Sequence, residues 1–345
     1  MKIRASVLAA LVMASGLVLG SCRSTASGPA GDPNDIKLEV GGIDKVIYLP
    51  AKLTEQLGFF KEQGLNVTLL DEPAGASAEN QLVAGEVHGV VGFYDHTIDL
   101  QSKGKCITSV VQLADVPGEV EVVGSKAAGE IKSPADFRGK KLGFTSPGSS
   151  TDFLTQYLAT KSGVGTQEYT GVKAGAGQTF IAAIDNGGID AGMTTDPTVA
   201  KLVDSGKAKV LLDMRTEEGT NAALGGLYPS SSLYMDCAYV EQHEEQVQKL
   251  ANAFVKTLDF IQKHSAEEIA AAMPPDFAGG NRDLYLKAIN DTKGMFNGTG
   301  KMRPEGAKNV LEVLARFHPT VKDKHDQIDL SKTYTTKFAD KAQPR

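Results

Sequence analysis

Residues 87–113, VHGVVGFYDHTIDLQSKGKCITSVVQL, contain the strand–helix–strand unit that decides the fold class. The apolar runs 87–92 and 107–113 are typical of buried strands, and residues 95–103 between them are predicted to form a helix. Strands that alternate with helices of about ten residues indicate a largely parallel sheet covered by helices. The unit therefore predicts an α/β protein.

The same alternation continues on both sides of this unit. It restarts near residue 131 as a second series of strands and helices, and a helical period dominates from residue 240 to about 317. Two α/β series followed by a helical region predict two lobes, with a chain that crosses between them more than once. Further strands are predicted at residues 36–40, 66–70, 141–144, 189–193 and 209–212.

The amino terminus has the pattern of an export signal. Lys2 and Arg4 precede the apolar stretch 5–19, which is shorter than the roughly 20 residues that a membrane-spanning helix needs. The stretch ends in Leu-Gly-Ser-Cys, which resembles the lipobox of bacterial lipoproteins; an ordinary signal peptide cleaved nearby is the alternative. We expect residues 1–21 to be removed and Cys22 to carry acyl chains. The protein would then work outside the cytoplasm, lipid-anchored to the cell membrane.

The composition is that of an acidic globular protein. The full chain has 36 Lys and Arg against 42 Asp and Glu, so it lacks the basic surface that nucleic-acid binding requires. Cys106 and Cys237 remain once Cys22 is assigned to the lipid. In an exported protein these two either form a disulfide or stay as buried thiols. No spacing of Cys or His indicates a metal site.

Five short motifs occur between residues 48 and 151: YLP (48–50), LGFFKEQGL (57–65), LVAGEV (82–87), DFRGKKLG (136–143) and SPGSST (146–151). In this order they resemble the solute-binding lipoproteins of ABC importers for nitrate, taurine, alkanesulfonates and thiamine precursors. The resemblance covers roughly residues 36–330. Each motif alone is weak evidence, whereas their common order is strong evidence.

The resemblance implies a type II periplasmic-binding-protein fold. Two α/β lobes, each a mixed sheet flanked by helices, are joined by hinge strands and close on a ligand. The hinge crossings are expected near residues 120–124 and 230–235. The expected division of the chain is a flexible linker at 22–35, a first lobe at 36–123 and 231–330, a second lobe at 124–230, and a C-terminal tail at 331–345.

Candidate ligand-binding residues come from the places where strands end and helices begin. In open α/β sheets, ligands bind beyond the carboxyl ends of strands. Helix N-termini there offer free N–H groups and partial positive charge to an oxyanion. The residues predicted to bind the ligand are Tyr48, Ser77, Tyr94, Asp95, His96, Ser146, Gly148, Ser149, Ser150, Thr151, Thr194, Thr195 and Arg215.

Structural roles compete with ligand binding at several of these positions. Ser149 and Asp152 fit a capping box, and Asp196 before a proline fits a helix cap. Asp95 either caps its own helix or pairs with an ammonium group on a zwitterionic ligand. Arg215 follows the last strand of the second series, where it either grips an oxyanion or forms a surface ion pair with neighbouring acids.

The sequence contains no nucleophile elbow, no HExxH and no Walker loop. We therefore predict that the chain is not an enzyme and uses no cofactor. The resemblance implies a monomeric binding lipoprotein that delivers a small organic anion or zwitterion, like a sulfonate, taurine or nitrate, to a membrane permease with its ATPase. The alternatives are a sensor partner, or a thiamine-pyrimidine or menaquinone synthesis enzyme of the same fold. The Cys-Cys-Cys-Phe-Cys run of the pyrimidine enzymes is absent.

Overall fold

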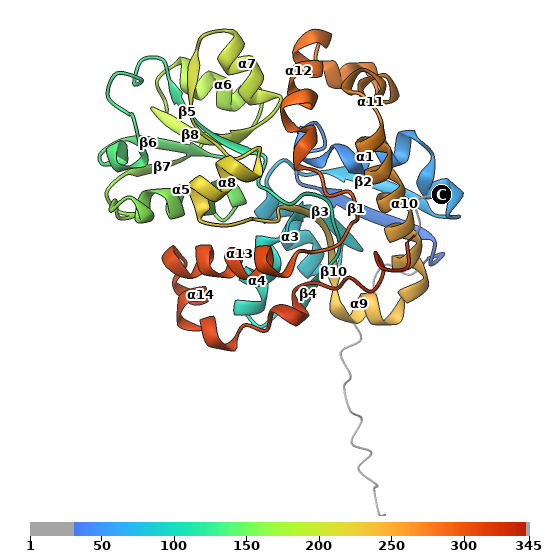
Figure 1. Ribbon diagram of the computed structural model, residues 1–345. Helices are drawn as coiled ribbons and strands as arrows, with labels where there is room; N and C mark the ends of the chain where they lie inside the picture. Colours follow the sequence, from blue (N-terminus) through green and yellow to red (C-terminus); the bar gives the residue numbers. More distant parts are fainter. Residues whose placement is uncertain (1–30, 343–345) are drawn as a thin grey trace, which may run out of the picture.

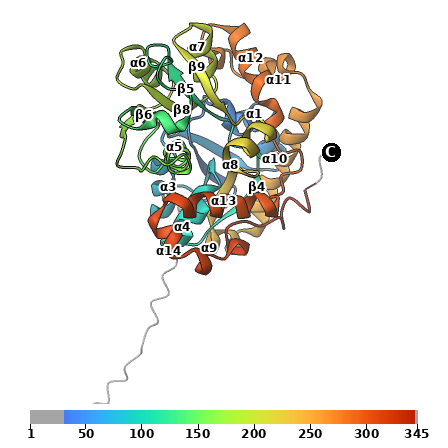
Figure 2. The ribbon, with the colours of Figure 1, turned by 60° about the vertical axis from the view of Figure 1, so that its left-hand side comes forward.

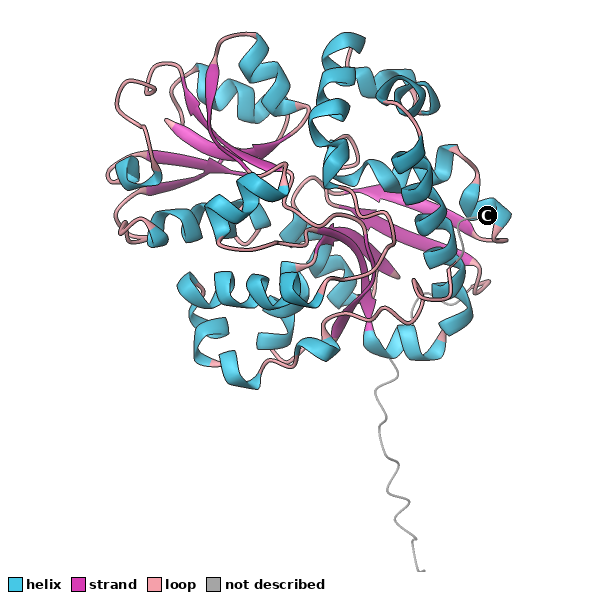
Figure 3. Ribbon diagram, viewed as in Figure 1, coloured by secondary structure: helices cyan, strands magenta, loops and turns pink. Residues whose placement is uncertain are grey.

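The computed structural model describes residues 31–342, so the predicted signal, Cys22 and most of the predicted linker lie outside the described residues. The described chain forms two lobes that lie side by side, the second of them coloured from green to yellow in Figure 1. Each lobe contains a five-stranded mixed sheet with helices packed around it (Figure 3). The predicted two-lobed α/β fold is confirmed.

The first lobe is built on the strands β1 (Asp35–Val40), β2 (Asn66–Asp71), β3 (Gly89–Phe93), β4 (Ile107–Gln112) and β10 (Ser231–Asp236). Their order in the sheet is β2-β1-β3-β10-β4. β1 runs parallel to β2 and β3, whereas β10 runs antiparallel to β3 and β4. Every residue of β3 and β4 is buried, as their apolar sequences predict.

The second lobe is built on the strands β5 (Glu119–Gly124), β6 (Lys141–Phe144), β7 (Thr170–Lys173), β8 (Ala191–Thr195) and β9 (Ala208–Asp213). Their order is β7-β6-β8-β5-β9. β6 is parallel to β7 and β8, whereas β5 is antiparallel to β8 and β9. The antiparallel strand of each sheet thus follows a crossing between the lobes. β5 is the first strand after the chain enters the second lobe, and β10 is the first strand after the chain returns to the first lobe.

Helices cover both sheets. The helices of the first lobe that precede β5 in the sequence are α1 (Leu49–Gln56), α2 (Phe59–Glu62), α3 (Gly75–Ala84) and α4 (Asp95–Ser102). The 3-10 turn η1 (Val46–Tyr48) lies directly before α1. Those of the second lobe are the 3-10 turn η2 (Pro134–Phe137), α5 (Ser150–Lys161), α6 (Gln178–Asp185), α7 (Thr198–Asp204) and α8 (Glu217–Leu224).

The predicted helical region after residue 240 is also present. Its helices are α9 (Cys237–Gln242), α10 (Glu244–Lys263), α11 (Ala266–Ala272), α12 (Arg282–Thr292), α13 (Pro304–Phe317) and α14 (Pro319–Asp323). Short 3-10 turns lie at η3 (Pro275–Ala278), η4 (Lys293–Met295), η5 (His325–Gln327) and η6 (Leu330–Lys332). Leu250, Phe254 and Leu258 of α10 recur at helical spacing and are fully buried. None of the helices within residues 31–342 combines the length and the apolar character that crossing a bilayer requires.

Helices of the C-terminal region also contact the second lobe. α12 lies against α7 in both views (Figure 1, Figure 2), and α13 packs on α5. Phe153 of α5 stands 5.9 Å from Phe317 of α13, measured between ring centroids. The largest buried apolar cluster accordingly contains residues from both lobes. The two lobes therefore pack against each other in this structure.

The chain crosses between the lobes at residues 113–118 and 225–230. The two crossings run side by side, because the Ser230 N–H donates to the Ala114 carbonyl at 3.1 Å. The predicted first-lobe boundary at residue 123, with a crossing at 120–124, is therefore wrong, and the predicted second crossing at 230–235 falls mostly within β10. Residues 119–124 are β5, a full member of the second sheet. The alternating pattern of this segment predicts a strand, but only its hydrogen bonds to β8 and β9 decide which sheet it joins.

The predicted C-terminal tail also needs correction, since residues 331–342 pack on the first lobe. Ser109 of β4 donates its N–H to the Thr333 carbonyl at 2.9 Å and accepts from the Thr335 N–H at 2.8 Å. Phe338 is 2% exposed. The segment thus satisfies the otherwise open edge of β4, which is a common way to protect an edge strand.

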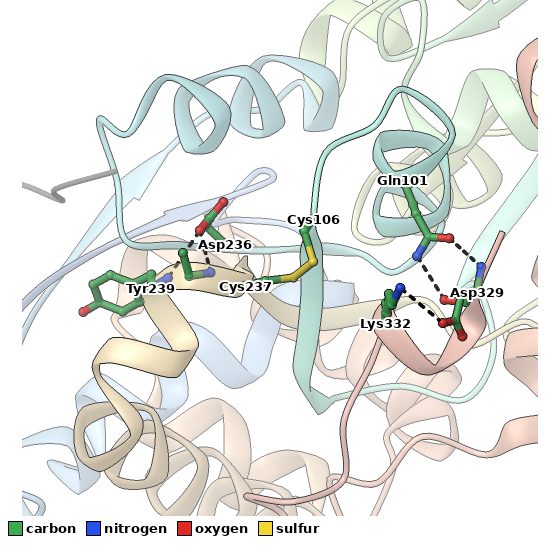
Figure 4. The surroundings of a disulfide bond; sticks show 8 residues. Gln101, Cys106, Asp236, Cys237, Tyr239, Asp329 and Lys332 are labelled. Carbon is green, nitrogen blue, oxygen red and sulfur yellow. Dashed lines mark hydrogen bonds and ion pairs between the residues drawn. A yellow bond between two sulfur atoms is a disulfide. The ribbon is translucent and has the colours of Figure 1, made fainter. Parts of the chain in front are cut away.

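Cys106 and Cys237 form a disulfide (Figure 4). Cys106 directly precedes β4 and Cys237 directly follows β10. Because these strands are antiparallel neighbours, their ends meet, and the two Cα atoms are 5.5 Å apart, within the usual range for a disulfide. The bond therefore closes a loop that contains the entire second lobe.

β5 carries a buried acid without a partner. Glu121 has no exposed surface, and neither carboxylate oxygen has a hydrogen-bond partner within residues 31–342. Burial alone raises its pKa well above the ordinary value of 4.5. The unfolded chain therefore loses this proton at lower pH than the folded chain does, so Glu121 lowers stability as pH rises above that value.

We expect Glu121→Leu to raise the free energy of unfolding by about 1–3 kcal/mol near neutral pH, because it removes two unsatisfied polar atoms at similar volume. Urea unfolding of both proteins between about pH 4 and pH 8 measures the difference, which should grow as pH rises. A difference that is independent of pH would contradict the role assigned to the charge. Glu121→Gln, which keeps the shape and removes only the charge, separates the two contributions.

Candidate ligand-binding site

A small cavity lies between the lobes, of about 20 Å³, enough for one water molecule. Its walls come from the carboxyl ends of β3 and β8, from the segments that follow β1, β2, β3, β6 and β7, and from the start of β5; the strands other than β5 are parallel to a neighbour. This is the crevice beyond the carboxyl ends of strands where α/β proteins bind ligands. The lining residues are Lys45, Ile47, Tyr48, Gly75, Phe93, His96, Glu119, Thr145, Ser149, Ser150, Thr151, Ala176, Thr194 and Thr195.

The first lobe supplies the aromatic wall of the cavity. Tyr48 and Phe93 meet edge to face, with ring centroids 6.4 Å apart. Lys45 is nearby, but its ammonium donates to the carbonyls of Gly41 at 2.7 Å and Pro73 at 2.8 Å. Burial lowers the pKa of Lys45 to about 8, although nearby acids partly oppose the shift. This lysine is therefore already bonded to the backbone of its own lobe.

His96 brings a positive charge to the same wall. Its Nδ1 lies 2.8 Å from Oε2 of Glu79, and the ring is 1% exposed. Burial would lower the pKa of His96, but the carboxylates of Glu79 and Asp95 outweigh it and raise the pKa to about 9. His96 is thus protonated at neutral pH and paired with Glu79.

The second lobe supplies hydroxyl groups at the start of α5. The Thr151 hydroxyl accepts from the Thr145 N–H at 3.0 Å and contacts the Ser149 hydroxyl at 2.8 Å. The predicted capping box does not form, because the Ser149 hydroxyl donates to the Ser146 carbonyl at 2.7 Å. Asp152 instead accepts from the Gly148 N–H at 2.8 Å. The loop is therefore held by its own side chains while Ser149 and Thr151 face the cavity.

Asp95 lies behind the cavity wall and joins the lobes. It is fully buried and accepts from the Ser150 hydroxyl and from the Tyr228 hydroxyl, each at 2.8 Å. Burial raises its pKa, while His96 and the two hydroxyl donors oppose the rise. Ser150 belongs to the second lobe and Tyr228 to the returning crossing. Asp95 thus neither caps its helix nor lines the cavity.

Glu119 begins β5, directly opposite Thr195 of β8. The side chain is 1% exposed and lines the cavity, and its Oε2 has no hydrogen-bond partner within residues 31–342. Burial raises the pKa of Glu119 well above its ordinary value; nearby Asp95 adds to the rise and Lys45 opposes it. A buried acid without a partner therefore faces the cavity.

The structure places seven of the predicted ligand-binding residues around the cavity: Tyr48, His96, Ser149, Ser150, Thr151, Thr194 and Thr195. It does not bring the other six to the wall. Ser77 is half-buried in α3, and Ser146 and Gly148 hold the loop before α5. Tyr94 is fully buried; its hydroxyl pairs with that of Thr333 and its ring contacts Tyr334, on the C-terminal segment.

Arg215 binds carboxylates of the protein itself. Its Nη1 lies 2.9 Å from Asp196 and 3.2 Å from Asp291 of α12, and its Nη2 lies 2.6 Å from Asp213. The Arg215 side chain is 12% exposed. Two roles were predicted for Arg215. The structure does not show Arg215 placed to bind a ligand oxyanion. It shows the ion pairs with acidic residues, but they are largely buried, whereas a surface ion pair was expected.

Sequence reasoning missed seven lining residues: Lys45, Ile47, Gly75, Phe93, Glu119, Thr145 and Ala176. Gly75 and Ala176 come at the starts of α3 and α6, where the rule used for the other candidates would also have found them. The rule does not find Glu119, because Glu119 lies at the amino end of β5. Since β5 is antiparallel to β8, the amino end of β5 lies beside the carboxyl end of β8. Within residues 31–342, no group of His, Cys, Asp and Glu is arranged to hold a metal ion.

Residues 48–268 match the profile of the family described as NMT1/THI5 like. The chain belongs to this family. A protein from Bordetella bronchiseptica RB50 has a similar structure, with a TM-score of 0.84 and 32% identity over 89% of this NMT1/THI5-like chain and 96% of its own. The alkanesulfonate-binding protein SsuA from Xanthomonas axonopodis pv. citri, bound to MOPS, has a TM-score of 0.65 at 18% identity, covering 89% and 99%. The periplasmic nitrate-binding protein NrtA from Synechocystis PCC 6803 has a TM-score of 0.66 at 14% identity, covering 88% and 87%. The last two likenesses show the periplasmic-binding-protein fold.

Curated relatives of this NMT1/THI5-like chain are named as enzymes. The 4-amino-5-hydroxymethyl-2-methylpyrimidine phosphate synthase of Aspergillus parasiticus is 26% identical over 70% of this chain and 72% of its own. The synthase THI13 of Saccharomyces cerevisiae is 31% identical, and the chain spans 42% of that relative's length. The family resemblance is confirmed, but the prediction that the chain is not an enzyme is contradicted by these names. The absence of a known catalytic motif was insufficient, because relatives named as synthases match the same chain whose fold resembles that of binding proteins.

Proposed function

We propose that this chain is the solute-binding component of an ABC importer, monomeric, outside the cytoplasm and held on the membrane by a lipid on Cys22. In this proposal it captures a small organic anion or zwitterion between its lobes and presents it to a permease with its ATPase. The observation that supports this most is the cavity between the lobes, whose walls come from both sheets. The likeness in fold to proteins named for binding alkanesulfonates and nitrate adds support.

The helix starts around the cavity suit the acidic end of such a ligand. Ser150 and Thr151 are the first residues of α5, and Ala176 lies just ahead of α6. The first N–H groups of a helix have no partner within the helix and carry partial positive charge. Together with the hydroxyls of Thr145 and Thr194, they offer the donors that a sulfonate or carboxylate would accept from.

Opening and closing would be required for entry, because the enclosed space holds only about one water molecule. The two adjacent crossings at 113–118 and 225–230 are the segments about which the lobes would rotate. A ligand that contacts both lobes only when they are together shifts the population toward the closed form. X-ray scattering should therefore show a smaller radius of gyration in the presence of the solute.

Filling the cavity should abolish binding. Ala176 is half-buried at the wall, so Ala176→Phe places a ring in the cavity at small cost to the fold. We expect the solute that stabilises the unaltered protein in a thermal-shift screen of sulfonates, carboxylates, nitrate and pyrimidines to lose at least about a hundredfold in affinity. Isothermal titration calorimetry measures the loss.

The matched control is Ala182→Phe, which adds the same ring to an exposed position on α6 away from the cavity. Its affinity should equal that of the unaltered protein. Equal affinities for all three proteins would contradict a binding site between the lobes. For the anchor, Cys22→Ser should release the protein into the medium, and retention on membranes would contradict lipidation at this residue.

A second candidate is the pyrimidine phosphate synthesis for which the curated relatives are named. The observation that favours it is that match over up to 70% of the chain. Both cysteines of the described region are joined in the disulfide, so residues 31–342 contain no free thiol. The test is formation of 4-amino-5-hydroxymethyl-2-methylpyrimidine phosphate by the purified chain: product at a rate above that of Ala176→Phe would favour this candidate over transport.

A further inference from the structure

We propose that Glu119 is the residue that sets ligand specificity, by pairing with a protonated nitrogen on the solute. The ligand would then be a compact zwitterion, with its acidic group at the helix starts and its ammonium or amidinium group at Glu119. This inference rests on the proposed function and makes it narrower, since simple anions would bind poorly.

The first observation behind this inference is the position of Glu119. Its side chain is 1% exposed, it lines the cavity, and its Oε2 has no hydrogen-bond partner within residues 31–342. Buried polar groups in folded proteins are nearly always satisfied, and each exception needs an explanation. A partner that arrives with the ligand is such an explanation, because the unpaired atom faces the space that the ligand would fill.

The second step is that other charged groups of the wall already have partners. The ammonium of Lys45 donates to two backbone carbonyls, of Gly41 and Pro73. His96 is paired with Glu79 at 2.8 Å. Of Lys45, His96 and Glu119, which are the acidic and basic side chains of the wall, Glu119 is therefore the one that forms neither an ion pair nor a side-chain hydrogen bond within residues 31–342.

The third step concerns energy. An ionised carboxylate is costly to bury without a partner, and burial accordingly raises the pKa of Glu119. A ligand nitrogen that donates to it would remove this cost and form a charge-assisted hydrogen bond. A ligand with only an acidic group has no nitrogen to donate to this carboxylate, so the carboxyl would stay in its protonated, neutral form and contribute no charge-assisted bond.

The test uses probes that differ only at the nitrogen. 2-Aminoethanesulfonate is compared with ethanesulfonate and 2-hydroxyethanesulfonate, and β-alanine with propionate, by calorimetry on the full chain. We expect the amine-bearing probe of at least one set to bind at least about thirtyfold more tightly than its amine-free partners. Glu119→Gln should remove most of this preference and leave the affinity for amine-free probes within about threefold.

The matched control is Glu121→Gln, which alters a buried glutamate two residues away on β5 that does not line the cavity. It should keep the preference of the unaltered protein. If Glu119→Gln does not fold, the comparison of probes on the unaltered protein still decides the question.

Three outcomes would overturn the inference. Amine-free probes that bind as tightly as their partners, or a preference that survives Glu119→Gln, would show that Glu119 does not select the ligand, while solute binding itself would stand. Failure of every probe here to bind would reject the zwitterion class. Only failure of the wider solute screen, with no difference between the unaltered protein and Ala176→Phe, would reject the proposed function.

Discussion

Replacing Arg215 with methionine is expected to lower the free energy of unfolding by about 3–5 kcal/mol, the range found when one partner of a buried ion pair is removed. Arg215 holds together three carboxylates, of which Asp196 is fully buried. Methionine fills a similar volume but leaves Asp196 without its charged partner and beside Asp213 and Asp291. Urea unfolding at neutral pH measures the loss.

The expected loss depends on pH in a definite direction. Burial would raise the pKa of Asp213, but its bonds to Arg215 outweigh this and lower the pKa below its ordinary value of 3.8. The stability that comes from this pair is present above that value and disappears as pH falls through the lowered pKa. The difference between Arg215→Met and the unaltered protein should therefore shrink in acid.

Two variants control this prediction. Arg215→Lys keeps the positive charge but not the planar guanidinium that donates to several carboxylates at once, so we expect an intermediate loss of unfolding free energy. Arg303→Met removes an exposed pair with Glu217, which is worth about 1 kcal/mol or less. Equal losses for Arg215→Met and Arg303→Met would contradict the structural role given to Arg215. Because Asp291 lies on α12 of the other lobe, scattering of Arg215→Met also tests whether this contact favours the closed form.

Removing the disulfide with the double variant Cys106→Ser and Cys237→Ser is expected to cost about 3–5 kcal/mol. The two cysteines are 131 residues apart in sequence, and a cross-link that closes so long a loop greatly reduces the freedom of the unfolded chain. Cys106 and Cys237 flank β4 and β10, so the bond also keeps these neighbours together if the second lobe opens. Urea unfolding, followed separately for each lobe, measures the cost.

The control for the disulfide is chemical. A reducing agent should destabilise the unaltered protein by a similar amount and leave the double variant unchanged. If reduction does not move the unfolding transition of the unaltered protein, the cross-link does not stabilise the fold. Replacing both cysteines together avoids the free thiol that either single variant would leave.

Local patterns predicted much of the fold correctly. The unit at residues 87–113 is observed as β3, α4 and β4, within about two residues at each end. Periodicity could not show that β3 and β4 are not neighbours, because β10 is inserted between them from more than a hundred residues further along. Local sequence specifies a strand through its apolar pattern, whereas its neighbours depend on the whole sheet.

The ligand-binding site shows the same difference between what local sequence predicts and what depends on the whole fold. The rule that ligands lie beyond the carboxyl ends of strands found Ser149 to Thr151 and Thr194, because those strands are parallel. It missed Glu119, since β5 is reversed. It misjudged Arg215, whose partners Asp196 and Asp291 come from segments that only folding brings together.

The amino-acid sequence by itself determined the α/β class, the two lobes, the family and the helix starts around the cavity, because these depend on short-range periodicity and on motifs within a few residues. Only the tertiary structure decided which lobe holds β5, which charges are paired, and that Glu119 faces the cavity. Those features depend on contacts between distant segments, and the burial that governs their energies exists only in the folded chain.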